Sequence, residues 1–251
     1  MLLAVDIGNS AIKLGLFDGD KLTSKFFIPT DRVLTTEQLA QQTDDRLNIQ
    51  IDDAIVCSVV PEVNGAVRRY LNEAWQMETR FVRSTDDLGL TIDFRVETTG
   101  ADRLINSFAA SKKYGTPCVV VSFGTATTID VVNEDREYLG GLIAPGMKVN
   151  AQALAIAASK LPEVELIKPA HVIAQTTETA IQSGIVYGQI EMIRGLLRRV
   201  TDELGERPKV AATGGFARLV ADEIEEISIV EDDLTLTGLM LLYSRGLIPD
   251  K

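Results

Sequence analysis

Short apolar runs, each ended by Gly, Asp or Asn, recur along this chain, and they open both of its halves. Runs of this length that are bounded by turn residues are typical of β-strands. In the first half we expect strands at Leu2–Asp6, Ala11–Phe17 and Leu22–Ile28. The second half begins with the same succession, and there we expect strands at Cys118–Val121, Thr125–Asn133 and Glu137–Ala144. Each half therefore opens with a predicted three-stranded meander.

Helical and strand patterns alternate after each meander. The first half continues with predicted helices at Thr36–Gln42 and Pro61–Trp75, strands at Asp53–Val59, Arg80–Val82 and Thr91–Arg95, and a helix that follows Gly100–Arg103 and runs to about Lys113. The second half continues with predicted helices at Asn150–Ser159, Ala180–Glu203, Phe216–Glu223 and Leu234–Gly246, and strands at Lys209–Thr213 and Ile227–Val230. This repetition predicts an α/β fold built from a duplicated unit. We expect two lobes, residues 1–114 and 115–251, with a cleft where the Gly turns of both lobes meet.

The charge of the chain narrows its classes of ligand. The 251 residues carry a net charge of −11, which argues against nucleic acid because a phosphate backbone requires a Lys/Arg patch. No apolar run approaches the roughly 18 residues that a membrane helix needs, and the N-terminal stretch lacks the basic region of a signal peptide. An acidic protein can still bind anions where backbone N–H groups or a metal ion supply the positive field.

The two cysteines predict a reducing environment. Cys57 and Cys118 lie beside or within apolar runs, far apart in the sequence, as buried thiols of a cytoplasmic protein do. Their spacing does not suit zinc, and His171 is the only histidine, which leaves no His/Cys metal site.

Two similar turns follow the first strand of each half. They are Asp6-Ile7-Gly8-Asn9-Ser10 and Ser122-Phe123-Gly124-Thr125-Ala126. A central glycine lets backbone N–H groups approach an anion, and the neighbouring amide and hydroxyl groups add donors, so two such turns suit a polyphosphate. Asp6 is placed to hold Mg²⁺ directly or through water. The alternative is that Gly8 and Gly124 only form tight hairpins.

Three further motifs are candidates for ligand contacts. In Gly100-Ala101-Asp102-Arg103, the carboxylate could act as a general base toward a hydroxyl and the guanidinium could clamp a carboxylate, or the pair could be a helix cap beside a surface cation. Thr213-Gly214-Gly215-Phe216 ends a strand and opens a helix, where backbone could pack against ribose or adenine. The Gly-rich stretch Gly140–Gly146 is either a wall against a substrate or a sharp strand-to-helix corner.

These motifs, in this order, resemble those of the type III pantothenate kinases of the acetate and sugar kinase/Hsp70/actin superfamily. The similarity runs nearly end to end and covers Asp6–Ser10, Gly100–Arg103, Gly124–Thr128, Gly140–Gly146, Thr177–Gly188, Thr213–Gly215 and Asp233–Leu239. The resemblance implies a duplicated actin/Hsp70-like (ribonuclease H-like) fold. It also implies ATP-dependent phosphorylation of pantothenate to 4′-phosphopantothenate, the first step of coenzyme A biosynthesis.

The resemblance further implies roles for individual residues. Asp102 would be the catalytic base on the primary hydroxyl of pantothenate, and Asp6 would serve Mg²⁺ and the phosphates. The ATP- and phosphate-binding residues would be Asp6, Gly8, Asn9, Ser10, Lys13, Gly124, Thr125, Ala126, Thr127 and Gly214. The substrate-binding residues would be Gly100, Ala101, Asp102, Arg103, Gly141 and Thr177. Members of the family are homodimers that need Mg²⁺ and a monovalent cation, K⁺ or NH₄⁺, and the dimer interface contributes to the substrate site.

Two departures from the family pattern stand out. Ser122 occupies the position where the family carries an Asp associated with the phosphates and the monovalent cation. Loss of a group that stabilises charge only in the transition state costs about 3–4 kcal/mol, or about 100–1000-fold in rate. Ser122 is therefore a lesion in an impaired kinase, a change compensated by other groups, or the mark of a non-catalytic relative. The stretch Phe94–Glu97 replaces an aromatic-x-Asn-Pro segment, which leaves its substrate contacts open.

Other classes of protein make different predictions. A sugar or acetate kinase or a phosphatase of the same superfamily would be expected to show other substrate motifs and usually a longer chain. A binding or regulatory relative would bind nucleotide or pantothenate without forming phosphopantothenate. A Rossmann dehydrogenase is poorly supported, because the first Gly turn leads into a strand and the chain has no G-x-G-x-x-G.

Overall fold

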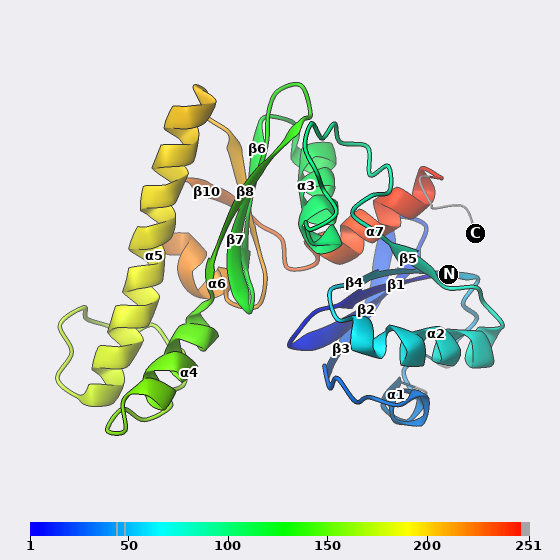
Figure 1. Ribbon diagram of the computed structural model, residues 1–251, viewed down its shortest axis with the longest axis horizontal. Coiled ribbons are helices and arrows are strands. Elements are labelled where there is room, and N and C mark those ends of the chain that lie inside the picture. Colours follow the sequence, from blue (N-terminus) through cyan, green and yellow to red (C-terminus); the bar gives the residue numbers. More distant parts are fainter. Residues whose placement is uncertain (44, 48, 247–251) are drawn as a thin grey trace. The chain divides into compact units, whose positions relative to one another are not determined.

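The computed structural model describes residues 1–43, 45–47 and 49–246, and the chain divides into two compact units (Figure 1). The first unit comprises residues 1–109 together with the segment that begins at Leu234, and the second comprises residues 110–233. Each unit contains one five-stranded sheet. Within the described part of the chain, no helix is both long enough and apolar enough to cross a membrane.

The sheet of the first unit has the strand order β3-β2-β1-β4-β5. Its strands are β1 (Leu2–Ile7), β2 (Ala11–Asp18), β3 (Lys21–Pro29), β4 (Asp53–Ser58) and β5 (Arg80–Val82). The first three form an antiparallel meander, whereas β4 runs parallel to β1 and β5 runs parallel to β4. All six residues of the central strand β1 are buried, so its nearly continuous apolar run reflects a strand that is covered on both faces.

Among the described residues the first unit has four helices, and the two faces of its sheet differ in what covers Asp6 and its neighbours on β1. The helices are α1 (Thr36–Thr43), α2 (Pro61–Trp75), α3 (Ala101–Tyr114) and α7 (Leu234–Ser244). Leu3 and Val5 of β1 pack into one core with residues of α1 and α2. Side chains alternate between the two faces of a strand, so Asp6 lies on the opposite face. That face receives α7, for which Gly15 leaves room, since an added Cβ there would lie 3.0 Å from Leu236 Cδ1.

The sheet of the second unit has the strand order β10-β9-β6-β7-β8. Its strands are β6 (Cys118–Phe123), β7 (Ala126–Val132), β8 (Tyr138–Pro145), β9 (Lys209–Thr213) and β10 (Ile227–Val230). Here β6, β7 and β8 form the antiparallel meander, β9 runs parallel to β6, and β10 runs parallel to β9. The order that starts at β3 in the first sheet matches the order that starts at β8 in the second sheet, strand for strand. Both units therefore have the same topology, which confirms the predicted duplicated α/β fold.

The helices of the second unit are α4 (Met147–Ala157), α5 (Thr177–Leu204) and the short α6 (Ala217–Val220), which continues as a 3-10 turn (Ala221–Glu223). α5 begins with a capping box, in which the side chains of Thr176 and Thr179 each accept from the other's backbone N–H. One face of β6 packs with α5 in an apolar core that includes Val119, Val121 and Ile193.

The predicted strand at Thr91–Arg95 is wrong. Only Thr91 makes an isolated bridge, and the rest of this stretch has no regular structure. Four of its five residues are exposed, including Phe94 at 45%, so the stretch lacks the buried face that would hold it in a sheet. Elsewhere the differences are at element ends: α4 and α5 each begin three residues before the predicted starts at Asn150 and Ala180.

The second unit begins earlier and ends earlier than the predicted second lobe, residues 115–251. The boundary falls within α3, close to the predicted residue 115, but α7 belongs to the first unit. The physical reason is packing: α7 lies against β1, β2 and β4, and Gly238 approaches α3 so closely that a Cβ there would lie 2.5 Å from Ile105 Cγ2. A linear division of the sequence could not show this return of the chain.

Candidate active site

Asp6 lies next to the last residue of the buried strand β1, beside the ammonium of Lys13. Its side chain lies across from Lys13 of β2, and the two form an ion pair with Nζ and Oδ2 3.7 Å apart. Asp6 is only 7% exposed, and this burial raises the pKa of its carboxyl to about 6, with the Lys13 charge opposing the rise and the Asp102 charge adding to it. The effect of the Asp102 charge on Asp6 places the two carboxylates in the same electrostatic environment, although 96 positions separate them in the sequence.

Asp102 lies in the first turn of α3, in the same unit as Asp6. Burial raises the pKa of the Asp102 carboxyl, while hydrogen bonding to the Arg103 backbone and the charges of Arg103 and Lys13 oppose the rise. Gly100 makes room for this carboxylate, because a Cβ at Gly100 would collide with Asp102 Oδ1. The structure therefore brings together Asp6, Lys13 and the Gly100–Arg103 motif, all predicted from the sequence.

Cys57 is a further group of this site, which the sequence predicted to be a buried thiol but did not place near Asp6. It pairs in register with Asp6 on the neighbouring strand β4 and is fully buried. Burial raises the pKa of its thiol well above the ordinary value, and the negative charges of Asp6 and Asp102 add to the effect. The thiol therefore stays protonated and is a poor nucleophile. Cys118 is also buried and free, so the prediction of two buried thiols is confirmed.

The carboxylate of Asp6, near that of Asp102, fits a magnesium ion. Mg²⁺ keeps several waters and usually takes one or two protein carboxylates together with phosphate oxygens. Over the described residues no three His, Cys, Asp or Glu side chains form a complete metal cage. The raised pKa of Asp6 indicates that Lys13 compensates its charge only in part. A divalent cation could supply the rest of that charge.

In both glycine turns the glycine N–H donates to a carbonyl at the start of the next strand, but the first turn is one residue longer than the second. Gly8 N donates to the carbonyl of Ala11 at 3.1 Å, and Gly124 N donates to the carbonyl of Ala126 at the same distance. Each turn follows the central strand of its sheet and leads into the next antiparallel strand. Plain hairpins would have these hydrogen bonds as well. Only the residues around each turn can distinguish an anion-binding turn from a plain hairpin.

Two other glycine motifs close around the second turn. Gly146 donates to the Thr125 carbonyl at 3.1 Å, and a Cβ at Gly146 would collide with the Gly124 carbonyl. Gly214 has a φ of +95°, and a Cβ there would lie 2.6 Å from the Phe123 carbonyl. Only glycine allows both approaches. The Gly140–Gly146 and Thr213–Gly215 motifs are thus packed against the Gly124 turn, within the second unit.

Ser122 is half-buried on β6 and pairs with Thr128 of β7. A buried carboxylate, that of Asp130, lies two residues from Thr128 on β7 and therefore on the same face of the sheet. Asp130, 1% exposed, accepts from Thr128 Oγ1 at 3.1 Å and from the Tyr138 hydroxyl at 2.7 Å. The sequence analysis missed Asp130, although a polar residue in the apolar run of β7 was a signal for it. Its full burial among hydroxyl donors gives it a structural place in the sheet.

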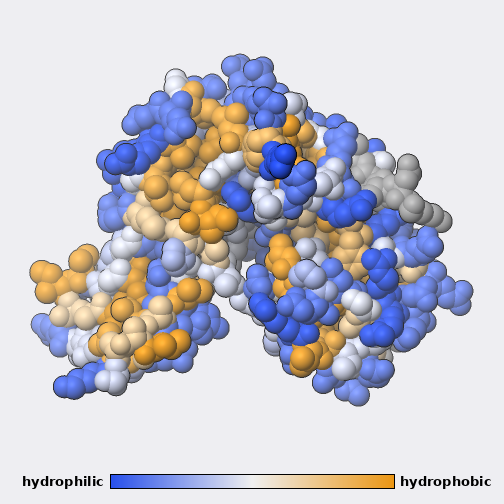
Figure 2. Space-filling model, viewed as in Figure 1, coloured by the Kyte–Doolittle hydropathy of each residue, from blue (hydrophilic) through white to orange (hydrophobic). Residues whose placement is uncertain are grey.

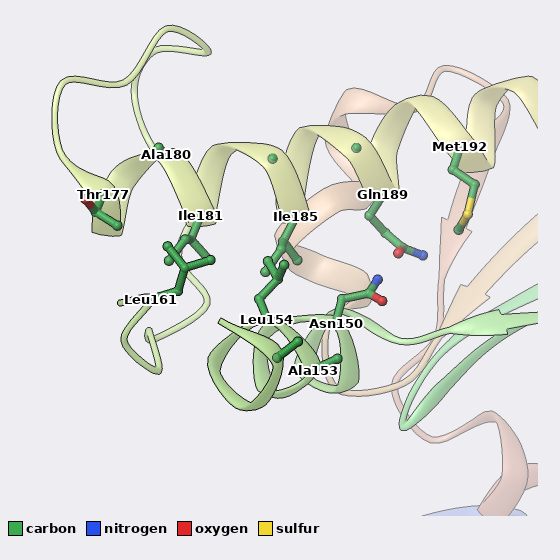
Figure 3. Close-up of a pocket in the computed structure, with 13 residues that line it drawn as sticks. Asn150, Ala153, Leu154, Leu161, Thr177, Ala180, Ile181, Ile185, Gln189 and Met192 are labelled. Atoms are coloured by element: carbon green, nitrogen blue, oxygen red, sulfur yellow. The ribbon is translucent and has the colours of Figure 1, made fainter. Parts of the chain in front are cut away.

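The remaining predicted residues of the second unit lie in different surroundings. The hydroxyl of Thr127 is buried and accepts from Gln189 Nε2 of α5 at 2.9 Å. Gly141 pairs with Asp130 across β7 and β8, where a Cβ would collide with the Ile129 carbonyl. Thr177 begins α5, at one end of a groove between α4 and α5 (Figure 3). Thr177 and Gly141 therefore lie in the second unit, whereas Gly100–Arg103 belong to the first.

Two sheets of one topology, each with a glycine turn after its central strand, define a duplicated actin-like fold. A protein from Campylobacter jejuni described as a Baf family transcriptional activator has this fold, with a TM-score of 0.60, 21% identity, and coverage of 97% of this chain and 98% of that chain. A Listeria monocytogenes protein described as an N-acetylmannosamine kinase matches with a TM-score of 0.52, 12% identity, and coverage of 98% and 99%. At these identities the likeness concerns the fold alone.

The chain belongs to the type III pantothenate kinase family, whose model matches residues 2–199. The type III pantothenate kinase of Brevibacillus brevis (strain 47 / JCM 6285 / NBRC 100599) is 40% identical over 253 residues, which cover 98% of this chain and 99% of that protein. The type III pantothenate kinase of Geotalea daltonii is 39% identical with the same coverage. The resemblance stated from the motifs is thereby confirmed.

Proposed function

We propose that this chain transfers the γ-phosphoryl group of ATP to the primary hydroxyl of pantothenate. Membership of the family supports this activity, and one observation of the structure carries it further. The buried carboxylate of Asp6 and the half-buried carboxylate of Asp102 interact beside Lys13, although they come from a strand and a helix that are distant in sequence. Phosphoryl transfer requires mainly positioned groups that orient the reactants and offset charge, and this cluster provides such groups.

Asp102 is the proposed general base. The hydroxyl oxygen of pantothenate forms a bond to the γ-phosphorus of ATP while its proton passes to Asp102, and the bond from that phosphorus to the β–γ bridging oxygen breaks to release ADP. Burial makes the Asp102 carboxylate a stronger base than an exposed one, because it raises the pKa toward the operating range. Arg103, next to it on α3, is suited to hold the carboxylate of pantothenate.

The residues proposed to bind the phosphates of ATP are those of the glycine turns and their neighbours, Gly8, Asn9, Ser10, Lys13, Gly124, Thr125, Ala126, Thr127 and Gly214. Bound Mg²⁺, held by Asp6, would neutralise part of the phosphate charge. Gly100, Ala101, Gly141 and Thr177 are proposed to contact pantothenate. Lys13 is supported by its ion pair with Asp6, and Gly214 by its packing on the Gly124 turn. Because the reaction uses ATP and the chain has two buried free thiols, we propose that it works in the cytoplasm.

Ser122 sets the expected rate and cation dependence. Its hydroxyl is neutral and a weaker ligand for K⁺ or NH₄⁺ than a carboxylate. Asp130 lies on the same face but is engaged by Thr128 and Tyr138, so it is a poor replacement. We therefore expect Ser122→Asp to raise the rate, by about 100-fold or more if the missing charge acts in the transition state.

The test is formation of 4′-phosphopantothenate from pantothenate and Mg-ATP in the presence of K⁺, measured for the wild type, Ser122→Asp and Asp102→Asn. We expect Asp102→Asn to lose about 100–10,000-fold, the range for removal of a general base. Equal turnover by the wild type and Ser122→Asp would mean that the second carboxylate is dispensable here. If neither forms product while both bind ATP and pantothenate, the kinase proposal is wrong and a non-catalytic binding role replaces it.

We also propose that the chain forms a homodimer through the groove between α4 and α5. The groove has a volume of about 850 Å³ and is lined largely by small and aliphatic residues (Figure 3). Ala180, Gly184 and Gly188 recur at four-residue spacing on α5, so one face of the helix admits close approach. Exposed apolar side chains lie nearby in the sequence, among them Ile156 at 86% and Ile173 at 89%, and apolar surface gathers over this part of the second unit (Figure 2).

A further inference from the structure

Thr30 ties the first glycine turn to the neighbouring strand. It directly follows β3, and its hydroxyl donates to the Gly8 carbonyl at 2.6 Å. Its backbone N–H donates to the Ser10 carbonyl at 3.2 Å. One residue outside the turn therefore holds two of the turn's carbonyl groups.

The side-chain bond fixes the direction of a specific N–H group. The carbonyl of Gly8 and the N–H of Asn9 belong to one planar trans peptide, in which they point in opposite directions. When Thr30 Oγ1 holds the Gly8 carbonyl, the Asn9 N–H must point away from Thr30. Because Gly8 has no side chain, this peptide could otherwise rotate at little cost.

The Asn9 N–H is available for a ligand. Within the described part of the chain, no group accepts a hydrogen bond from it, and Asn9 itself is exposed. Backbone N–H groups that are held in one direction without an internal acceptor form anion-binding concavities. The bond from Thr30 thus turns a flexible glycine peptide into a fixed donor.

We propose that Thr30 is a positioning residue for ATP: it orients the Gly8–Asn9 peptide so that the Asn9 N–H meets a phosphate oxygen. This inference rests on the proposed function, in which the first turn binds the phosphates of ATP. Thr30 itself touches neither substrate in this scheme and acts through the peptide that it holds.

The experiment compares three variants of the full-length chain. Thr30→Val keeps the shape of the side chain and the backbone N–H but removes the hydroxyl donor, whereas Thr30→Ser keeps the donor. Thr23→Val is the matched control, because Thr23 of β3 makes an equivalent bond to the Leu16 carbonyl at 3.0 Å in the same hairpin, away from the turn. Steady-state kinetics for each substrate, the thermal midpoint, and the backbone amide resonance of ¹⁵N-labelled Asn9 during titration with Mg-ATP are measured.

We expect Thr30→Val to raise KM for ATP about 3–10-fold, which is the effect of one lost hydrogen bond, while KM for pantothenate stays the same. Thr30→Ser should remain within about twofold of the wild type. The Asn9 resonance should shift on addition of Mg-ATP in the wild type and in Thr30→Ser, and much less in Thr30→Val. Both valine variants should have similar thermal midpoints.

Two results would overturn the inference. Equal KM values for ATP in Thr30→Val and Thr23→Val would mean that the Thr30 bond is only structural. A parallel rise of KM for both substrates in Thr30→Val would indicate general loosening of the unit. A different result would contradict the proposed function itself. In that case the Asn9 resonance of the wild type would not shift on addition of Mg-ATP, and both the proposed function and this inference would be wrong.

Discussion

At Gly100 the absence of a side chain decides where a neighbouring carboxylate lies. Asp102 Oδ1 occupies the space that a Cβ at residue 100 would fill, and Val59 Cγ1 lies 3.8 Å from the position of that Cβ. A buried charged group must be held where its partners can reach it, since burial alone disfavours the charge. The glycine thus acts on the chemistry of Asp102 by leaving it room, without making any polar contact of its own.

Gly100→Ala should therefore displace the Asp102 carboxylate and lower kcat about 10–100-fold, because misplacement of a catalytic group by about 1 Å costs up to roughly 100-fold. Gly65→Ala is the matched control, since Gly65 lies exposed within α2 with nothing within 4 Å of an added Cβ. That variant should gain about 0.5–1 kcal/mol of unfolding free energy from helix propensity and keep its activity. Turnover and urea unfolding measure both effects, and an unchanged kcat in Gly100→Ala would contradict the steric argument.

Among the elements, the end of α3 is fixed to the end of β10 by one carboxylate. Glu231 accepts from Tyr114 at 2.9 Å and pairs with the Lys113 ammonium, both in the last turn of α3. Burial by itself would raise the pKa of Glu231, but the hydrogen bonds from Lys113 and Tyr114 and the charge of Lys113 hold it below the ordinary value of 4.5. A carboxyl with a lowered pKa in the folded state stabilises the fold where it is ionised.

Glu231→Gln should therefore lower the unfolding free energy at pH 7 by about 1 kcal/mol, a value below that of a fully buried charged hydrogen bond because the pair is partly exposed. The contribution of Glu231 is complete above pH 4.5 and is lost as the pH falls through its lower folded-state pKa, so the two proteins should converge in acid. Urea unfolding between pH 3 and 7 measures this, with Glu225→Gln as an exposed control that should match the wild type throughout. A difference that persists unchanged at pH 3 would contradict the assignment.

At the scale of the whole molecule, the groove between α4 and α5 leaves apolar surface without a partner in a single chain. Leu154 is 39% exposed on α4, where it lines the groove together with Ile181 and Ile185 of α5 (Figure 3). Burial of such surface contributes about 25 cal/mol per Å². A second copy with the same small-residue face would be self-complementary, as a twofold interface requires.

Gly184→Glu should shift the protein from dimer to monomer. Gly184 lines the groove and has nothing within 4 Å of an added Cβ, so the fold tolerates the side chain while the interface receives a buried charge. Gly195→Glu introduces the same change on the same helix outside the groove, and that variant should stay dimeric. Light scattering coupled to gel filtration gives the masses. A monomeric wild type, or dimers in both variants, would contradict the proposed interface.

Much of the fold and part of the site could be predicted from the sequence. All ten strands that the structure describes were predicted from apolar runs with turn residues at their ends, and Arg80–Val82 is the shortest of them. The two glycine turns and the Gly100–Arg103 motif were also visible, because glycine and charged residues have special local roles. Thr91–Arg95 misled because its local composition suits a strand although no sheet edge receives it.

The sequence by itself determined the periodicity of its elements, the duplication and the turns, since each depends on residues close together in the chain. Only the tertiary structure decided that α7 joins the first unit, that Asp102 reaches the environment of Asp6, and that Thr30 holds the Gly8 carbonyl. These pairings join segments that are distant in sequence, and they arise where packing encloses polar groups that must find partners. No local pattern of residues encodes them, because burial is a property of the folded chain.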